Sequence, residues 1–116
     1  TKATFFVLTE QIEKYPNLLE RILSEGHALA SHSYTHAKFT SLDSAGLKSE
    51  LDDAVSVLSE KSGRKIEFFR LPYGAGVSVK SVRERIASLG LIHVFWNVDT
   101  LDWQDKNPDT IFKRTL

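Results

Sequence analysis

The sequence predicts an α/β fold in which β-α units alternate and the strands run parallel. Short apolar runs rich in β-branched and aromatic residues alternate with segments whose apolar residues recur at helical spacing. Three polar segments, at residues 32–36, 70–74 and 99–103, lie at or just after the carboxyl ends of expected strands. Parallel α/β folds place their active sites at this end of the strands. Alternation of this kind makes a parallel sheet with right-handed crossovers.

Four apolar runs are expected to form strands, at residues 3–8, 27–31, 67–71 and 91–98. The first run, ATFFVL, is continuous, which is typical of a strand covered on both faces. The aromatic residues of these runs are assigned to the core. They are Phe5, Phe6, Phe68, Phe69, Phe95 and Trp96.

Helical stripes are expected over residues 18–23, 47–58 and 79–89, and from residue 108 onward. N-caps or prolines precede them and glycines end them. The start signals are Pro16, Ser41, Ser78 and Asn107-Pro108, and the stop signals are Gly26, Gly63 and Gly90.

Four strands cannot close an ordinary barrel. The chain is therefore either a small open sheet or about half of a barrel of roughly 250 residues. A first residue that is Thr rather than Met, and a last helix that runs into Leu116, favour the half-barrel.

Composition narrows the class of function. The 116 residues carry 15 Lys and Arg against 15 Asp and Glu, so the formal net charge is zero. This argues against a general nucleic-acid or acidic-membrane binder, which needs a basic surplus. No apolar run approaches the roughly 18 residues of a transmembrane segment. The absence of cysteine excludes disulfides and thiolate metal ligands.

The segment from His32 to His36, with sequence HSYTH, is the leading candidate site. One turn of helix, or a tight loop entering a helix, puts residues i and i+4 on the same side. Two neutral imidazoles can then face one divalent ion such as zinc, with a third ligand from elsewhere in the fold. Histidines at this spacing more often have no metal, so spacing alone leaves both interpretations open.

Two further polar clusters follow strand ends. Arg70 and the turn Pro72-Tyr73-Gly74 combine a guanidinium suited to a carboxylate with a backbone N–H that could face an oxyanion. In the segment DTLDW, Asp102 could orient a histidine and Trp103 could stack on a sugar ring. Each cluster alone is equally compatible with a surface turn.

The two remaining histidines are interpreted as structural. His27 follows a glycine at the start of a strand and is expected to cap it. His93 lies within an apolar strand and is expected to be a hydrogen-bonded interior residue.

Taken together and in this order, the three clusters resemble those of the polysaccharide deacetylase family, which includes chitin, chito-oligosaccharide and peptidoglycan N-acetylglucosamine deacetylases. Residues 32–36, 70–74 and 99–103 match its H-[ST]-x-x-H, R-x-P-Y and D-x-x-D-W motifs. Residues 2–6 and 25–27 also resemble family segments, so the similarity covers essentially the whole chain.

The resemblance implies a distorted (β/α) barrel of seven or eight strands, of which residues 1–116 form part of one catalytic domain, truncated at both ends. It also implies metal-dependent hydrolysis of N-acetyl groups on a polysaccharide or oligosaccharide, with zinc as the expected ion and cobalt or a similar ion as the alternative. His32 and His36 would be two of three protein ligands. Arg70 would position the catalytic base, and the backbone N–H of Tyr73 would bind the oxyanion and line the substrate site.

By the same resemblance, Asp102 would tune a histidine acid and Trp103 would line the groove. The family's T-F-D-D motif supplies the base and the third ligand, and lies upstream of residues 2–6. Its L-x-x-H motif supplies the acid and lies downstream of Leu116. Because neither is in this sequence, the chain alone is expected to be inactive. An extracellular, cell-wall or periplasmic location follows from the family alone, and the oligomeric state is not indicated.

Three other interpretations stay open. The chain could be a catalytically inactive relative that binds carbohydrate. It could be a hydrolase of the same architecture that acts on another bond, such as an acetyl ester of xylan or a small cyclic amide. It could also be a doubly wound α/β domain with unrelated loops.

Overall fold

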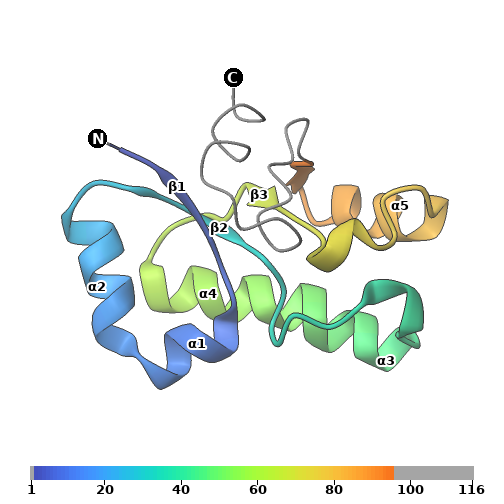
Figure 1. The fold of residues 1–116 in the computed structure, drawn as a ribbon, viewed down its shortest axis with the longest axis horizontal. Coiled ribbons are helices and arrows are strands. Elements are labelled where there is room, and N and C mark those ends of the chain that lie inside the picture. The colour runs from blue at the N-terminus through green and yellow to red at the C-terminus, as the bar shows by residue number, and fades with distance from the viewer. Residues whose placement is uncertain (1, 96–116) are drawn as a thin grey trace, which may run out of the picture.

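The central feature of the fold is a sheet of four parallel strands, in the order β1-β2-β3-β4 (Figure 1). The structure is a computed structural model, and it describes residues 2–95. The strands are β1 (Thr4–Val7), β2 (Ala28–Ser31), β3 (Phe68–Phe69) and β4 (Ile92–His93). Their parallel pairing and the helical segments between them confirm the predicted α/β class.

Helical segments make the connections between the strands. They are α1 (Thr9–Lys14), α2 (Pro16–Ser24), the 3-10 helix η1 (Phe39–Ser41), α3 (Ser44–Leu47), the π-helix η2 (Lys48–Asp53), α4 (Ala54–Ser62), the 3-10 helix η3 (Pro72–Gly74) and α5 (Lys80–Ser88). The single long helix expected after residue 47 is thus interrupted by a π-helical segment. Among residues 2–95, none of the helices combines the length and the hydropathy that a membrane span requires.

Several predicted helix ends are confirmed. Pro16 occupies the first turn of α2, where its missing N–H costs no hydrogen bond. Gly63 follows α4 with a φ of 68°, and its N–H donates to the Ser59 carbonyl. Gly26 and Gly90 have φ values of 77° and 74°, just beyond α2 and α5. These left-handed conformations favour glycine, so the sequence signal and the geometry agree.

Two predicted N-caps are wrong. Ser41 ends the 3-10 helix η1, and Asp43 caps α3 instead, because its carboxylate accepts from the Gly46 N–H at 2.8 Å. Ser78 does not cap α5, whose N-cap is Val79 with no side-chain hydrogen bond. Both errors displace the helix start by one or two residues, within the range over which helix ends fray.

Helix α1 was not predicted at all. Its sequence, TEQIEK, contains a single apolar residue, Ile12, so no helical stripe is visible. Ile12 is nevertheless buried in the core, and α1 packs against α4. Tertiary packing, rather than periodicity, therefore fixes this short helix.

The core lies between the sheet and its helices, where α2 and α4 both contact β2 (Figure 1). Phe69 is fully buried, and its ring centroid lies 5.6 Å from that of Phe39. The other buried apolar residues include Ile12, Leu19, Ile22, Leu29, Leu51, Leu58, Leu71, Val82 and Ile86.

The prediction that the strand aromatics are all core residues is wrong for Phe5, Phe68 and Phe95, which are exposed. Phe68 pairs with Ile92, so both lie on the sheet face opposite to Phe69, away from the helical layer. Phe5 lies on β1, which is an edge strand of the described sheet. The first strand is accordingly not covered on both faces in the described part of the chain. Trp96 and the expected elements beyond it lie outside the described residues.

Candidate metal and substrate site at the carboxyl edge of the sheet

His32 and Arg70 each follow the last residue of a strand, on neighbouring strands β2 and β3. The His32 N–H donates to the Val7 carbonyl at 2.9 Å, and the Arg70 N–H donates to the Ser31 carbonyl at 3.0 Å. These backbone bonds continue the sheet ladder by one residue. Because parallel strands end at the same edge, both side chains are placed at one end of the sheet.

The His32 ring is fixed by a main-chain acceptor. Its Nδ1 lies 2.7 Å from the carbonyl oxygen of Arg70. A carbonyl only accepts, so Nδ1 carries the proton, and the lone pair of Nε2 is the one available to a ligand. Burial lowers the pKa of His32, the hydrogen bond to Arg70 opposes this, and positive charge at His36 and Arg70 lowers it further. The lowered pKa favours the neutral form of the ring.

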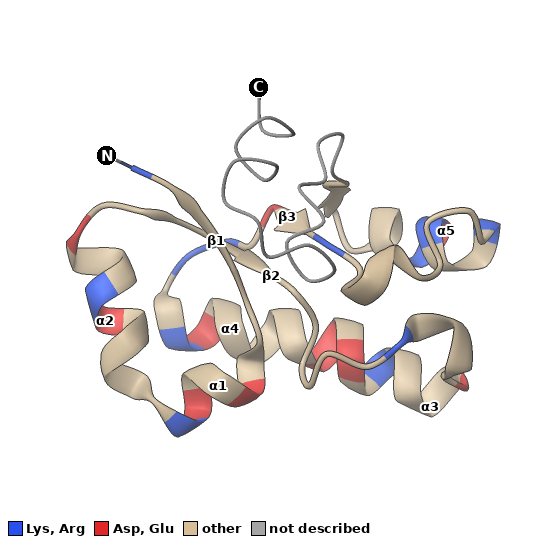
Figure 2. Cartoon of the chain, in the orientation of Figure 1, with Lys and Arg blue, Asp and Glu red and all other residues tan. Residues whose placement is uncertain are grey.

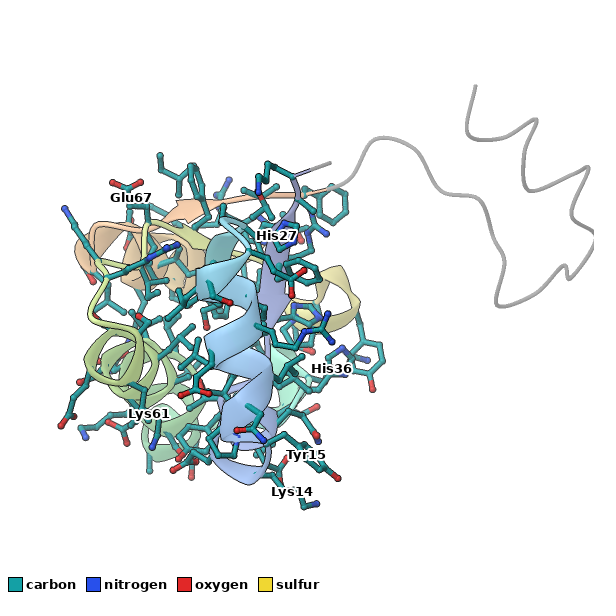
Figure 3. The ribbon with its side chains drawn as sticks, turned by 90° about the vertical axis from the view of Figure 1, so that its left-hand side faces the viewer. Lys14, Tyr15, His27, His36, Lys61 and Glu67 are labelled. Carbon is teal, nitrogen blue, oxygen red and sulfur yellow. The ribbon has the colours of Figure 1, made fainter. Side chains whose placement is uncertain are left out.

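The predicted pairing of His32 with His36 is observed. Their ring centroids are 4.8 Å apart, at an interplanar angle of 63°. The segment is a loop, and no helical turn is present. Ser33 and His36 have φ values of 79° and 72°, a left-handed conformation that costs a non-glycine residue about 1–2 kcal/mol. Figure 3 shows His36 at the surface, on the side of the molecule away from Lys61 of α4.

The first turn of α1 holds this loop from one side. The N–H groups of Thr9 and Glu10 donate to the carbonyls of Ser33 and Tyr34 at 3.2 and 3.0 Å. Such N-terminal donors have no partner within their own helix, so they are available for the loop. The Ser33 hydroxyl accepts from the His36 N–H at 2.9 Å, which closes the loop on itself.

Glu50 of η2 holds the same loop from the other side. Its Oε1 atom accepts from the Thr35 N–H at 3.0 Å, the Thr35 hydroxyl at 2.8 Å and the Ala37 N–H at 3.3 Å. Glu50 is only 6% exposed. Figure 2 shows the acidic stretch of η2 beside the loop that follows β2. Sequence reasoning missed this residue, although Glu50 lies at helical spacing from Leu47 and Ala54, on the apolar stripe.

The Arg70 side chain contacts a residue of β1 and the residue that follows β4. Its Cζ lies 4.2 Å from the centroid of the Phe6 ring, and its Nε donates to the Val94 carbonyl at 3.2 Å. Within residues 2–95, no carboxylate lies at ion-pair distance from this guanidinium. The role of Arg70 in positioning a carboxylate base stays a prediction.

Tyr73 follows the buried Pro72, and its ring contacts that of His36. Its ring centroid lies 4.7 Å from that of His36, at an angle of 66°, and the residue is 68% exposed. Its φ of 60° is again left-handed. The R-x-P-Y and H-x-x-x-H segments are thus in contact, as the shared sheet edge predicted.

The other two histidines form hydrogen bonds, as expected. His93 accepts through Nε2 from the Leu71 N–H at 3.2 Å, and burial followed by the positive charge of Arg70 lowers its pKa. His27 accepts through Nδ1 from the Ala3 N–H at 3.1 Å.

The imidazole pair is a partial set of metal donors. A neutral ring with its Nδ1–H on a carbonyl is the arrangement that metal-binding histidines adopt, so the chemistry of His32 fits such an ion. Within residues 2–95 no group of three or more His, Cys, Asp or Glu side chains gathers around one point. Asp102 and Trp103 lie outside the described residues, so their roles stay predictions.

Comparison with known proteins agrees with the arrangement of the motifs. The polysaccharide deacetylase family model matches residues 1–94. The peptidoglycan-N-acetylglucosamine deacetylase of Bacillus cereus is 32% identical over 115 residues, which cover 99% of this chain and 41% of the relative. Chitin deacetylase 1 of Saccharomyces cerevisiae is 31% identical over 103 residues, covering 89% of this chain and 34% of the relative.

Solved structures share the fold. A mutant of a CE4 family pseudoenzyme with restored enzymatic activity matches with a TM-score of 0.88 at 25% identity, over 99% of this chain and 42% of that one. The chain thus spans less than half the length of these three relatives. Its strands and helices correspond to part of the (β/α) barrel of the solved structures. With the family model matched across residues 1–94, the chain belongs to the polysaccharide deacetylase family.

Proposed function

We propose that the protein is a metal-dependent hydrolase that removes N-acetyl groups from an N-acetylglucosamine-containing polysaccharide of peptidoglycan or chitin type. The observation that carries the proposal is the pair His32 and His36, with rings 4.8 Å apart and the Nδ1 of His32 tied to the Arg70 carbonyl. The names of the relatives support the substrate class. On this proposal, residues 1–116 are part of one catalytic domain, and the substrate places the protein outside the cytoplasm, in the cell wall or the periplasm.

His32, through Nε2, and His36 would hold the ion, zinc by preference and cobalt or a similar ion as the alternative. Such an ion, when bound, supplies Lewis acidity toward a carbonyl oxygen and a water molecule. An amide needs this help because it is a poor electrophile with a poor leaving group.

The other residues would act on the substrate and on the protons. The backbone N–H of Tyr73 would donate to the developing oxyanion, where one donor is worth about 3 kcal/mol. Arg70 would orient the carboxylate base that takes a proton from water. Asp102 would raise the basicity of a histidine that protonates the departing sugar amine. Trp103 would stack on a sugar ring and line the groove.

A second candidate is a relative that binds carbohydrate without hydrolysing it. The observation that raises it is the similarity to a mutant of a CE4 family pseudoenzyme, in which enzymatic activity was restored. An acetyl ester of xylan, or a small cyclic amide, is the alternative substrate for an active enzyme. A doubly wound domain with unrelated loops is excluded by the family match.

The test is acetate release by the full-length protein from N-acetylglucosamine oligomers, peptidoglycan and acetylated xylan, before and after removal of metal by a chelator. We expect release from the first two substrates, loss of release after chelation, and recovery with zinc or cobalt. Binding of oligomers without acetate release would establish the inactive relative. Release from acetylated xylan alone would establish the esterase.

A further inference from the structure

We infer that Glu50 is the positioning residue of the His32–His36 loop, fixing the two imidazoles for the metal ion. This inference rests on the proposed function, and it assigns a task to a residue outside the motifs named above. The Glu50 carboxylate has three hydrogen-bond donors in the loop. One oxygen atom, Oε1 of Glu50, accepts from the Thr35 N–H, the Thr35 hydroxyl and the Ala37 N–H.

The two N–H groups belong to the residues on either side of His36. Thr35 and Ala37 donate to the same oxygen at 3.0 and 3.3 Å, so the backbone on both sides of the His36 Cα is tied to one point. His36 itself has a φ of 72°, a conformation that a non-glycine residue keeps only when its surroundings impose it. The direction of the His36 ring therefore depends on the carboxylate.

Glu50 has no competing partner in the described part of the chain. Its neighbours on η2 pair elsewhere: Asp53 with Lys48 at 3.2 Å, and Asp52 with Arg85 at 3.1 Å. Within residues 2–95, no Lys or Arg lies at ion-pair distance from Glu50. A carboxylate that is 6% exposed is thus satisfied by the loop, and the loop N–H groups are satisfied by the carboxylate.

Glu50 lies on the side of η2 that faces the core and the loop. Glu50 and Leu51 are the two buried residues of η2. Leu51 joins the core, while Glu50 reaches the loop. π-Helical turns are rare, and those inside α-helices are frequently found at functional sites. The interruption of α3 and α4 at residues 48–53 thus coincides with the residue that holds the loop.

The test uses the full-length protein with Glu50→Ala, Glu50→Gln and Thr35→Val, and Asp52→Asn as the matched control on the same π-helix. Zinc affinity is measured by competition with a chromophoric chelator, and hydrogen exchange of residues 33–37 is measured in the metal-free protein. We expect Glu50→Ala to weaken zinc binding by about 10–100-fold, the usual effect of losing a partner behind a metal ligand. Exchange of the Thr35 and Ala37 amides should rise at the same time.

Glu50→Gln keeps a carbonyl acceptor at the same place and should retain most of the affinity. Thr35→Val removes only the hydroxyl donor and should give an intermediate loss, which keeps the test decisive if Glu50→Ala does not fold. Asp52→Asn should change neither readout. The inference would be overturned if Glu50→Ala kept the wild-type zinc affinity and amide exchange. It would also be overturned if Asp52→Asn lost as much zinc affinity as Glu50→Ala. Failure of the proposed function would be seen separately. In that case the wild type and His32→Ala would bind zinc equally, and the positioning role would also be refuted.

Discussion

The Nδ1 atom of His32 lies 2.7 Å from the carbonyl oxygen of Arg70, although the two residues are 38 positions apart in the chain. The bond joins the segment after β2 to the segment after β3. It uses the main chain of Arg70, so it does not depend on the guanidinium. The orientation of the histidine and the function of the Arg70 side chain can therefore be separated by mutation.

Arg70→Ala should lower deacetylase turnover by roughly 100-fold, the cost of a misplaced catalytic group, while zinc affinity stays close to the wild-type value. The carbonyl that orients His32 is retained, and only the guanidinium beside Phe6 is lost. Steady-state kinetics and a zinc titration on the same preparation provide the measurement. Loss of zinc together with turnover would mean that the side chain supports the site structurally.

His32→Ala and His36→Ala should each abolish metal binding and activity together. Removing a ligand should weaken zinc affinity by more than the roughly 10–100-fold that losing an outer partner costs. Metal content by elemental analysis and acetate release are the two readouts. His27→Ala is the matched control, since His27 bonds to the Ala3 N–H far from the loop. Full metal content and rate in either variant would refute the ligand assignment.

The stability of the protein should fall as the pH drops below about 6.5, in part because of His93. Its pKa is lowered in the folded state by burial and by the charge of Arg70, whereas in the unfolded chain it is near 6.5. Between those two pKa values the unfolded state binds more protons, so unfolding becomes easier as pH falls. Below the folded pKa the effect levels off.

Melting temperatures of the wild type and His93→Asn from pH 8 to pH 5 measure this contribution. The melting temperature of the wild type should fall further on acidification than that of His93→Asn. At high pH the variant should be the less stable of the two, because the Leu71 N–H loses its acceptor. Parallel pH profiles for the two proteins would contradict the assignment.

Phe69→Ala should destabilise the protein by about 3–5 kcal/mol, the usual cost of removing a buried aromatic side chain. The ring is fully buried and contacts Phe39. Phe68→Ala is the control, since that neighbour is 37% exposed on the other face of the sheet, and its effect should be clearly smaller. Urea unfolding of both variants measures the difference, and equal losses would show that the two faces are wrongly assigned.

Much of the fold was predictable because it follows from local patterns. Continuous apolar runs indicated the strands, and glycines with positive φ ended the helices where expected. The exposure of Phe68 was not predictable from its run, since a continuous apolar sequence does not say which face receives helices. Helix α1 was invisible because one buried residue, Ile12, gives no period.

The proximity of the two histidines was predictable from the sequence, and the way in which the loop achieves it was not. The i, i+4 spacing of His32 and His36 suggested a shared target, and the structure brings the rings together. The spacing could not reveal that left-handed residues, rather than a helical turn, do this. Helical spacing placed Glu50 on the apolar stripe, but its bonds to the backbone N–H groups of the loop leave no motif in the sequence.

The bonds that hold the histidine loop come from α1 on one side and η2 on the other. A synthetic pentapeptide copied from residues 32–36 would therefore sample many shapes and bind zinc weakly. Transplanting the motif into another scaffold would require the first turn of α1 and a buried acid in the place of Glu50 as well. The unit that can be transferred therefore consists of the loop, the first turn of α1 and the buried acid together.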